Sequence, residues 1–174
     1  MKTILAFVDD LYEDLELWYP KIRLEEEGWK VVVAGPRGGQ VYTGKHGYPC
    51  KAAVDIGEIE DPLAYDALLV PGGFSPDKLR RYPDVLSIVQ AIHKANRPIA
   101  FICHAGWILI SADILRGRRA TSTVGIKDDM RNAGAIWEDS PLVVDGNLIS
   151  SRTPADLHVF ALALVNALKA TTNP

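Results

Sequence analysis

The adjacent residues Cys103 and His104 offer the clearest chemistry in the sequence, because they lie between two apolar segments. Residues 98–102 have the length and composition of a buried strand, and the apolar residues after Gly106 have helical spacing. A side chain at such a turn projects from the carboxyl end of the strand. The N–H groups of the following helix favour negative charge, so we expect a lowered pKa for the Cys103 thiol. Cys103 is therefore a candidate nucleophile, with His104 as its base and acid.

A purely structural role is the alternative for Cys103, since a free cysteine packs in a core as a small hydrophobic side chain. The elements around it decide between the two roles. Apolar runs of strand length alternate with helical segments along most of the chain. The predicted strands are 4–8, 30–34, 65–70 and 98–102, and the main predicted helices are 11–27, 84–96 and the segment after Thr153. This alternation predicts a doubly wound α/β fold, with a mostly parallel sheet and helices on both faces.

Ligands of doubly wound sheets bind beyond the carboxyl ends of the strands. Three segments with chemically useful residues are predicted to lie there: 9–16, Gly72-Gly73 and Cys103-His104. Their convergence favours a catalytic Cys103 over a structural one. Residues 142–149 have the pattern of a hairpin about an Asp-Gly turn. Residues 40–62 lose any clear period, and only short extended pieces on either side of a turn near 44–49 are indicated.

Composition limits the classes of partner. The chain has 174 residues, of which 48% are hydrophobic, and is expected to form a single domain over residues 1–174. A net charge of -3 and a pI of about 5.8 argue against nucleic acid and membrane surfaces as partners. The N-terminal apolar run is too short for a signal peptide or a membrane span, so a cytoplasmic protein is expected. The two cysteines cannot form a disulfide framework, and the four histidines lack metal-ligand spacing, so no metal is expected.

Motifs along nearly the whole chain resemble those of the DJ-1/PfpI superfamily, and specifically its PfpI-type intracellular peptidase or glyoxalase branch. The matching stretches are Glu13-Asp14-Leu15-Glu16 with Tyr19-Pro20, Thr43-Gly44-Lys45-His46-Gly47-Tyr48, Pro71-Gly72-Gly73, Ile102-Cys103-His104, Leu109-Ile110-Ser111-Ala112, Gly125-Ile126-Lys127-Asp128-Asp129, Val144-Asp145-Gly146-Asn147, Ser150-Ser151-Arg152 and Pro154-Ala155-Asp156. The resemblance implies a flavodoxin-like fold shared with class I glutamine amidotransferases, and assembly into dimers or hexamers.

The same resemblance implies roles for individual residues. Cys103 matches the family nucleophile, and Glu13 matches the carboxylic acid that hydrogen-bonds its sulfur. Without the resemblance, the spacing favours a surface acid in the first helical turn for Glu13. Asp77 occupies the position of a glutamate that orients the histidine from a neighbouring subunit. Backbone N–H groups at Gly72, Gly73 and His104 are candidate donors to an oxyanion.

Three departures from the family pattern limit what can be carried over. Asp77 is one methylene shorter than the family glutamate, and Ala105-Gly106 and Thr123-Val124 stand where the family often has Gly-Pro and Tyr-Pro. Because these residues flank the predicted site, they affect the shape of its pocket. The substrate therefore does not follow from the resemblance alone.

The leading functional hypothesis is a cysteine-dependent enzyme acting on small reactive carbonyls. In a glyoxalase or deglycase of this type Cys103 attacks an aldehyde such as methylglyoxal, Glu13 or His104 moves protons, and water releases lactate without glutathione, metal or cofactor. The first alternative is a PfpI-type intracellular cysteine peptidase, in which the same residues form an acyl-enzyme. The second is a non-enzymatic redox or stress sensor that responds through oxidation of Cys103.

Overall fold

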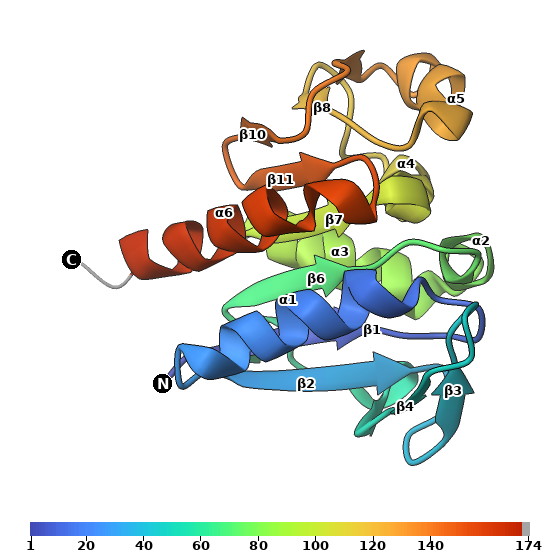
Figure 1. Cartoon of the computed structure of the whole chain (residues 1–174), viewed down its shortest axis with the longest axis vertical. Helices are drawn as coiled ribbons and strands as arrows, with labels where there is room; N and C mark the ends of the chain where they lie inside the picture. The colour runs from blue at the N-terminus through green and yellow to red at the C-terminus, as the bar shows by residue number, and fades with distance from the viewer. Residues whose placement is uncertain (172–174) are drawn as a thin grey trace.

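A seven-stranded sheet with the order β10-β11-β7-β6-β1-β2-β5 forms the centre of the computed structural model, which describes residues 1–171 (Figure 1). Its strands are β1 (Thr3–Phe7), β2 (Lys30–Gly35), β5 (Val54–Asp55), β6 (Ala67–Val70), β7 (Ile99–Ile102), β10 (Val143–Asp145) and β11 (Leu148–Ser151). All neighbouring strands pair in parallel except β10 with β11. The prediction of a mostly parallel sheet is confirmed, and so is the hairpin predicted over 142–149.

Helices cover both faces of this sheet, as a doubly wound fold requires. In Figure 1, α1 (Asp14–Glu26) and α6 (Leu157–Ala170) lie in front of the sheet, and α3 (Pro83–Lys94) lies behind it. The shorter helices are α2 (Ser75–Leu79), α4 (Gly106–Ser111) and α5 (Lys127–Asn132). None of the helices within residues 1–171 is long and apolar enough to cross a membrane.

Two hydrophobic cores result, one on each face, and the strands supply both by alternation. In β1, Leu5 and Phe7 pack toward α3, whereas Ile4 and Ala6 pack toward α1 and α6. Successive side chains of a strand point to opposite faces, so a strand covered on both sides must be apolar throughout. This explains the continuous apolar runs of the sequence. Because β1, β6 and β7 are neighbours and run in parallel, their carboxyl ends lie side by side.

Residues 40–62, whose structure the sequence left open, contain a hairpin and then an edge strand. The hairpin strands β3 (Val41–Thr43) and β4 (Pro49–Lys51) pair only with each other, and β5 then joins the main sheet beside β2. A further two-stranded sheet pairs β8 (Arg119–Ala120) with β9 (Ile136–Trp137). Single-turn helices occupy Ile56–Glu58, Pro62–Ala64, Cys103–Ala105, Val124–Ile126 and Pro154–Asp156.

The first helix begins later than the periodicity predicted, at Asp14 rather than residue 11. Leu11 has a left-handed backbone, with a φ of 65°, and Glu13 is the N-cap with φ -78° and ψ 118°. Residues 9–13 therefore form a loop beyond the carboxyl end of β1. That loop brings the acidic residues of the first helical turn toward β6 and β7.

Candidate active site

Cys103 stands at a strained turn directly after β7. Its φ is 63°, in the left-handed region that non-glycine residues rarely adopt, and the single-turn helix Cys103–Ala105 and then α4 follow it. The Cys103 carbonyl accepts a hydrogen bond from the Thr123 N–H at 3.3 Å, and the side chain is 9% exposed. The strand, turn and helix predicted around this cysteine are therefore present. Strain of this kind persists only where the surrounding structure imposes it, and it is concentrated at functional sites.

His104 places a ring nitrogen within reach of the thiol. Its Nδ1 lies 3.2 Å from the Cys103 sulfur, and its ring packs against those of Phe74 and Trp107, with centroids 6.4 and 5.1 Å away. Burial, together with the positive charge of Lys45, lowers the pKa of His104 below its usual value. The imidazole is thus neutral near neutral pH, which is the form that can accept a proton from a thiol.

The carboxyl group that lies beside Cys103 belongs to Glu16, because a Cβ on Gly72 would touch both Glu16 Oε2 and the Cys103 Cβ. The oxygens of Glu13 are instead turned to the Glu16 N–H and to His46, so the assignment of that role to Glu13 is wrong. Glu16 is fully buried, and its Oε2 accepts the Gly72 N–H at 2.8 Å. Burial and the neighbouring negative charge of Glu13 raise the pKa of Glu16 to about 8. Its other oxygen, Oε1, is enclosed and receives no N–H or O–H bond from the residues that the structure describes. An oxygen in that position is suited to carry the proton that faces the sulfur.

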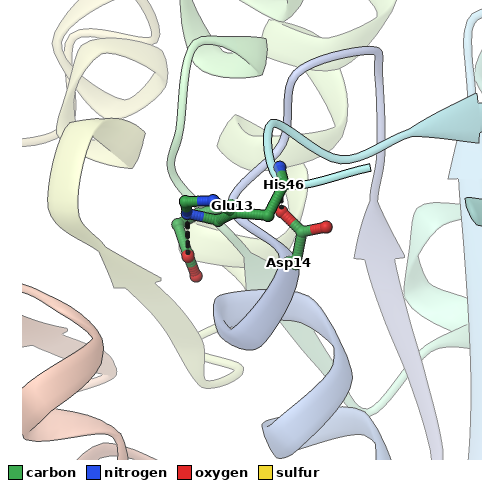
Figure 2. Close-up of side chains that lie close together, drawn as sticks. All are labelled: Glu13, Asp14 and His46. Atoms are coloured by element: carbon green, nitrogen blue, oxygen red, sulfur yellow. Dashed lines mark hydrogen bonds and ion pairs between the residues drawn. The ribbon is translucent and has the colours of Figure 1, made fainter. Parts of the chain in front are cut away.

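Glu13 has a different task, because it caps α1. Its Oε2 accepts the backbone N–H of Glu16 at 2.9 Å, and its Oε1 lies 3.6 Å from Nε2 of His46 (Figure 2). A cap residue turns its side chain back onto the helix, whereas the residue three positions later projects from the first turn. Glutamate is not among the common N-cap residues, so the sequence carries no clear signal for which of these two acids caps the helix.

The pKa of the Cys103 thiol in the free protein is higher than its position at a helix N-terminus predicts. Burial first, and then the negative charge of Glu16, raise the pKa of the Cys103 thiol to about 12, although the backbone N–H groups of His104 and Gly73 act to lower it. The predicted lowering of this pKa is therefore wrong, since desolvation of a buried thiol outweighs the N–H groups of a short helix. The contribution of Glu16 disappears while its carboxyl is protonated. The thiol then needs a base at the moment of attack, and His104 Nδ1 is the base in reach.

The two glycines beyond β6 contribute in different ways. A Cβ on Gly72 would lie 2.6 Å from Glu16 Oε2 and 2.8 Å from Cys103 Cβ, so only glycine lets these two side chains meet. Because the Gly72 N–H already bonds to Glu16, its prediction as an oxyanion donor is wrong. Gly73 has a φ of 80°, and its N–H joins that of His104 at the sulfur. These two N–H groups stay the candidate oxyanion donors.

Asp77 does not contact His104 within one chain. It lies in α2, where its Oδ2 pairs with Nη2 of Arg81 at 2.6 Å, and both side chains are exposed. No carboxylate of residues 1–171 contacts the His104 ring. Orientation of His104 by Asp77 is thus possible only between two copies of the chain, and it stays a prediction.

Glu13, Asp14 and His46 form a group whose potential ligand atoms all lie within 4.8 Å of one another (Figure 2). The two Asp14 oxygens accept the backbone N–H groups of His46 and Tyr48, both at 2.9 Å. One Glu13 oxygen is likewise engaged by the helix. These hydrogen bonds account for the grouping, because each carboxylate fixes either a turn or a helix end.

Fold and site together define an α/β protein with a cysteine at a nucleophile elbow and a buried carboxyl group beside it. The family model described as "DJ-1/PfpI family" matches residues 2–167. The chain belongs to the DJ-1/PfpI family, as its motifs predicted.

Two relatives illustrate the similarity in sequence. The chain is 46% identical over 169 residues to "Deglycase PfpI" of Pyrococcus furiosus, covering 97% of this chain and 100% of that protein. It is 39% identical over 168 residues to "Putative cysteine protease YraA" of Bacillus subtilis, covering 97% and 99%. The names given to relatives thus include both a deglycase and a putative protease.

Solved structures show the same fold. A two-domain protein of Anabaena variabilis, with DJ-1/ThiJ/PfpI-like and ferritin-like domains, superposes with a TM-score of 0.95 at 39% identity; the match covers 97% of this chain and 48% of that one. Drosophila melanogaster DJ-1beta superposes with a TM-score of 0.88 at 25% identity, covering 96% and 90%. The predicted fold class is confirmed.

Proposed function

We propose that the protein is a cysteine-dependent enzyme of the glyoxalase or deglycase type, which uses Cys103 to attack small reactive carbonyls such as methylglyoxal. One observation carries the proposal: the Cys103 sulfur, held at a strained elbow, lies 3.2 Å from a neutral His104 ring and beside the buried carboxyl of Glu16. This arrangement provides a nucleophile, its base and a proton donor in one place.

The chemistry follows from these positions. His104 Nδ1 takes the thiol proton as the sulfur adds to the aldehyde carbon, and the carbonyl oxygen becomes the hydroxyl of a hemithioacetal. N–H groups of Gly73 and His104 stabilise the oxyanion during addition. A proton then moves from the former aldehyde carbon to the neighbouring carbon through an enediol, with His104 or Glu16 as carrier. The product is a thioester, and water cleaves it to lactate and the free thiol.

Deglycation uses the same first step, since a sugar-modified amine still presents an electrophilic carbon to Cys103. Relatives named deglycases support this version of the proposal, at 44–46% identity over nearly the whole chain. The reaction is expected in a reducing compartment such as the cytoplasm, because Cys103 must stay a free thiol.

A cysteine peptidase is the second candidate, supported by the relative named a putative cysteine protease. Peptide hydrolysis would use Cys103 and His104 to form an acyl-enzyme. However, the Cys103 side chain is only 9% exposed, which favours small substrates over peptides. Oxidation of Cys103 in a sensor is the remaining alternative, and it differs from both enzymes in giving no turnover.

Incubation with methylglyoxal tests the proposal. We expect loss of the dicarbonyl and an equal amount of lactate from the wild type and from Cys50→Ala, and neither from Cys103→Ala. The Cys50→Ala variant is the matched control, because it removes the other buried thiol. If the wild type forms no lactate and no deglycated amine but cleaves short peptides, the peptidase is correct. Oxidation of Cys103 without any turnover would instead support the sensor.

A further inference from the structure

The turn between β3 and β4, residues 44–48, is fixed against the loop that precedes α1. The carboxylate of Asp14 accepts the N–H groups of His46 and Tyr48, and the N–H of Lys45 donates to the Tyr12 carbonyl at 2.8 Å. A Cβ on Gly44 would lie 2.2 Å from Asp14 Oδ1, so the turn and the helix end are in direct contact. Figure 2 shows this turn with the side chain of His46 directed at Glu13. The turn is thus a rigid part of the rim of the site.

Lys45 is the residue of this turn whose charge is uncompensated. It is exposed, and none of the carboxylates in residues 1–171 forms an ion pair with it. The two acids at the helix end that this turn packs against are already engaged: Asp14 by backbone N–H groups, and Glu13 by the helix end and His46. The Lys45 backbone is hydrogen-bonded to that of Tyr12, and Tyr12 in turn pairs with Gly73, which lies beside Cys103. Lys45 therefore stands at the loop that carries the site. In keeping with this position, its positive charge acts to lower the pKa of Glu16, Cys103 and His104.

We propose that Lys45 is a specificity-determining residue, which binds an anionic group of the substrate and so selects carbonyl compounds that carry a carboxylate or a phosphate. The reaction performed on them rests on the proposed function above. An unpaired cation at the mouth of a partly desolvated site attracts anions from solvent and raises their local concentration. Because Lys45 is exposed while the Cys103 thiol is buried, an anionic group of the substrate has more direct access to the ammonium than to the sulfur.

A competing role for Lys45 is to stabilise the thiolate, and two alkylating reagents separate the roles. Iodoacetate and iodoacetamide react with a thiol in the same way, but only iodoacetate is an anion. If Lys45 binds anions, Lys45→Gln lowers the ratio of the Cys103 alkylation rates, iodoacetate over iodoacetamide, by about 3- to 10-fold. If Lys45 acts only on the sulfur, both rates fall together and the ratio stays constant, which overturns the proposal.

Two further variants complete this test. Lys51→Gln removes the same charge from the same hairpin and should leave the ratio unchanged, whereas an equal fall in Lys51→Gln would show a general effect of net charge and overturn the assignment to Lys45. Lys45→Arg keeps the charge and should keep the ratio. Because alkylation needs no turnover, this measurement decides the proposal even if the protein proves not to be a glyoxalase.

Turnover provides a second measurement if the proposed reaction is correct. We expect Lys45→Gln to raise the KM for dioxopentanoate, a 2-oxoaldehyde with a carboxylate, by a similar factor of about 3 to 10. The KM for methylglyoxal, which is neutral, should change little. Equal changes for the two substrates would contradict the role of Lys45 in selecting anions.

Discussion

The elbow around Cys103 and the hairpin strand around Cys50 contain the two cysteines of the chain, and their sulfurs differ in surroundings rather than in burial. Both are free and buried, at 9% and 3% exposure. Burial raises the pKa of Cys50 to about 11 and, with the charge of Glu16, that of Cys103 to about 12. Cys50 lies within β4 and packs in the core beneath α1, and its thiol donates to the Lys51 carbonyl at 4.0 Å. Cys103 instead has a base, a carboxyl and two N–H groups.

This contrast shows that acidity at rest does not identify the nucleophile in this protein. A thiol with a raised pKa can still react if a neutral base is close enough to take its proton during attack. At Cys103 that base is His104, whereas within residues 1–171 no ring nitrogen or carboxylate hydrogen-bonds the Cys50 sulfur. The predictions below test the contrast between the two sulfurs, beginning with the largest effect.

Alkylation by iodoacetamide near neutral pH should modify Cys103 about 10³-fold faster than Cys50, because general-base assistance is worth roughly 10²- to 10⁴-fold. Peptide mass mapping after brief, stoichiometric treatment measures the two rates. His104→Ala should remove most of the difference. Preferential labelling of Cys50 would contradict the assignment of the nucleophile.

Asp77 tests whether the site around Cys103 is completed by a second copy of the chain. We expect Asp77→Ala to lose about 10²-fold in kcat, since an orienting acid is worth roughly 10²- to 10⁴-fold. Mixing it with inactive Cys103→Ala should restore part of the activity, because some interfaces then combine an intact Asp77 with an intact Cys103. Native mass spectrometry confirms that mixed oligomers form. Mixed oligomers without activity would exclude action between chains.

The pH dependence of kcat/KM should show an alkaline limb near pH 8. Glu16 has its pKa raised to about 8, so it holds a proton below that pH and becomes an anion beside the sulfur above it. Activity should therefore fall about tenfold per pH unit above 8, whereas the lowered pKa of His104 keeps the base neutral on the acid side. Glu16→Gln cannot titrate and should lack this limb. An unchanged limb in that variant would assign it to another group.

The smallest effect concerns stability. At position 103 the left-handed backbone favours glycine, so Cys103→Gly should be more stable than Cys103→Ala by about 1 kcal/mol. At position 50, in a strand, the order should reverse, with Cys50→Gly less stable than Cys50→Ala by about 1 kcal/mol. Urea unfolding of the four variants measures both differences. The same order at both positions would show that the elbow is not strained.

The mostly parallel sheet and the position of Cys103 at the carboxyl end of a strand could be predicted from the sequence, because buried parallel strands need continuous apolar runs and their carboxyl ends lie at one edge. The choice between Glu13 and Glu16 did not follow, although both acids were in view. That choice depends on where α1 begins, and the periodicity placed the start three residues too early. The rise in the Cys103 pKa could not be predicted from the sequence either, because it depends on the burial of the thiol and on the position of Glu16.

Short strands close both edges of the main sheet, since β5 has two residues and β10 has three. A sheet edge this short presents few free N–H and C=O groups, so it is a poor template for pairing with a strand of another molecule. Aggregation by edge-to-edge growth is thereby disfavoured. The edges of the main sheet thus leave association between copies of this chain to other surfaces, such as α2, on which Asp77 is exposed.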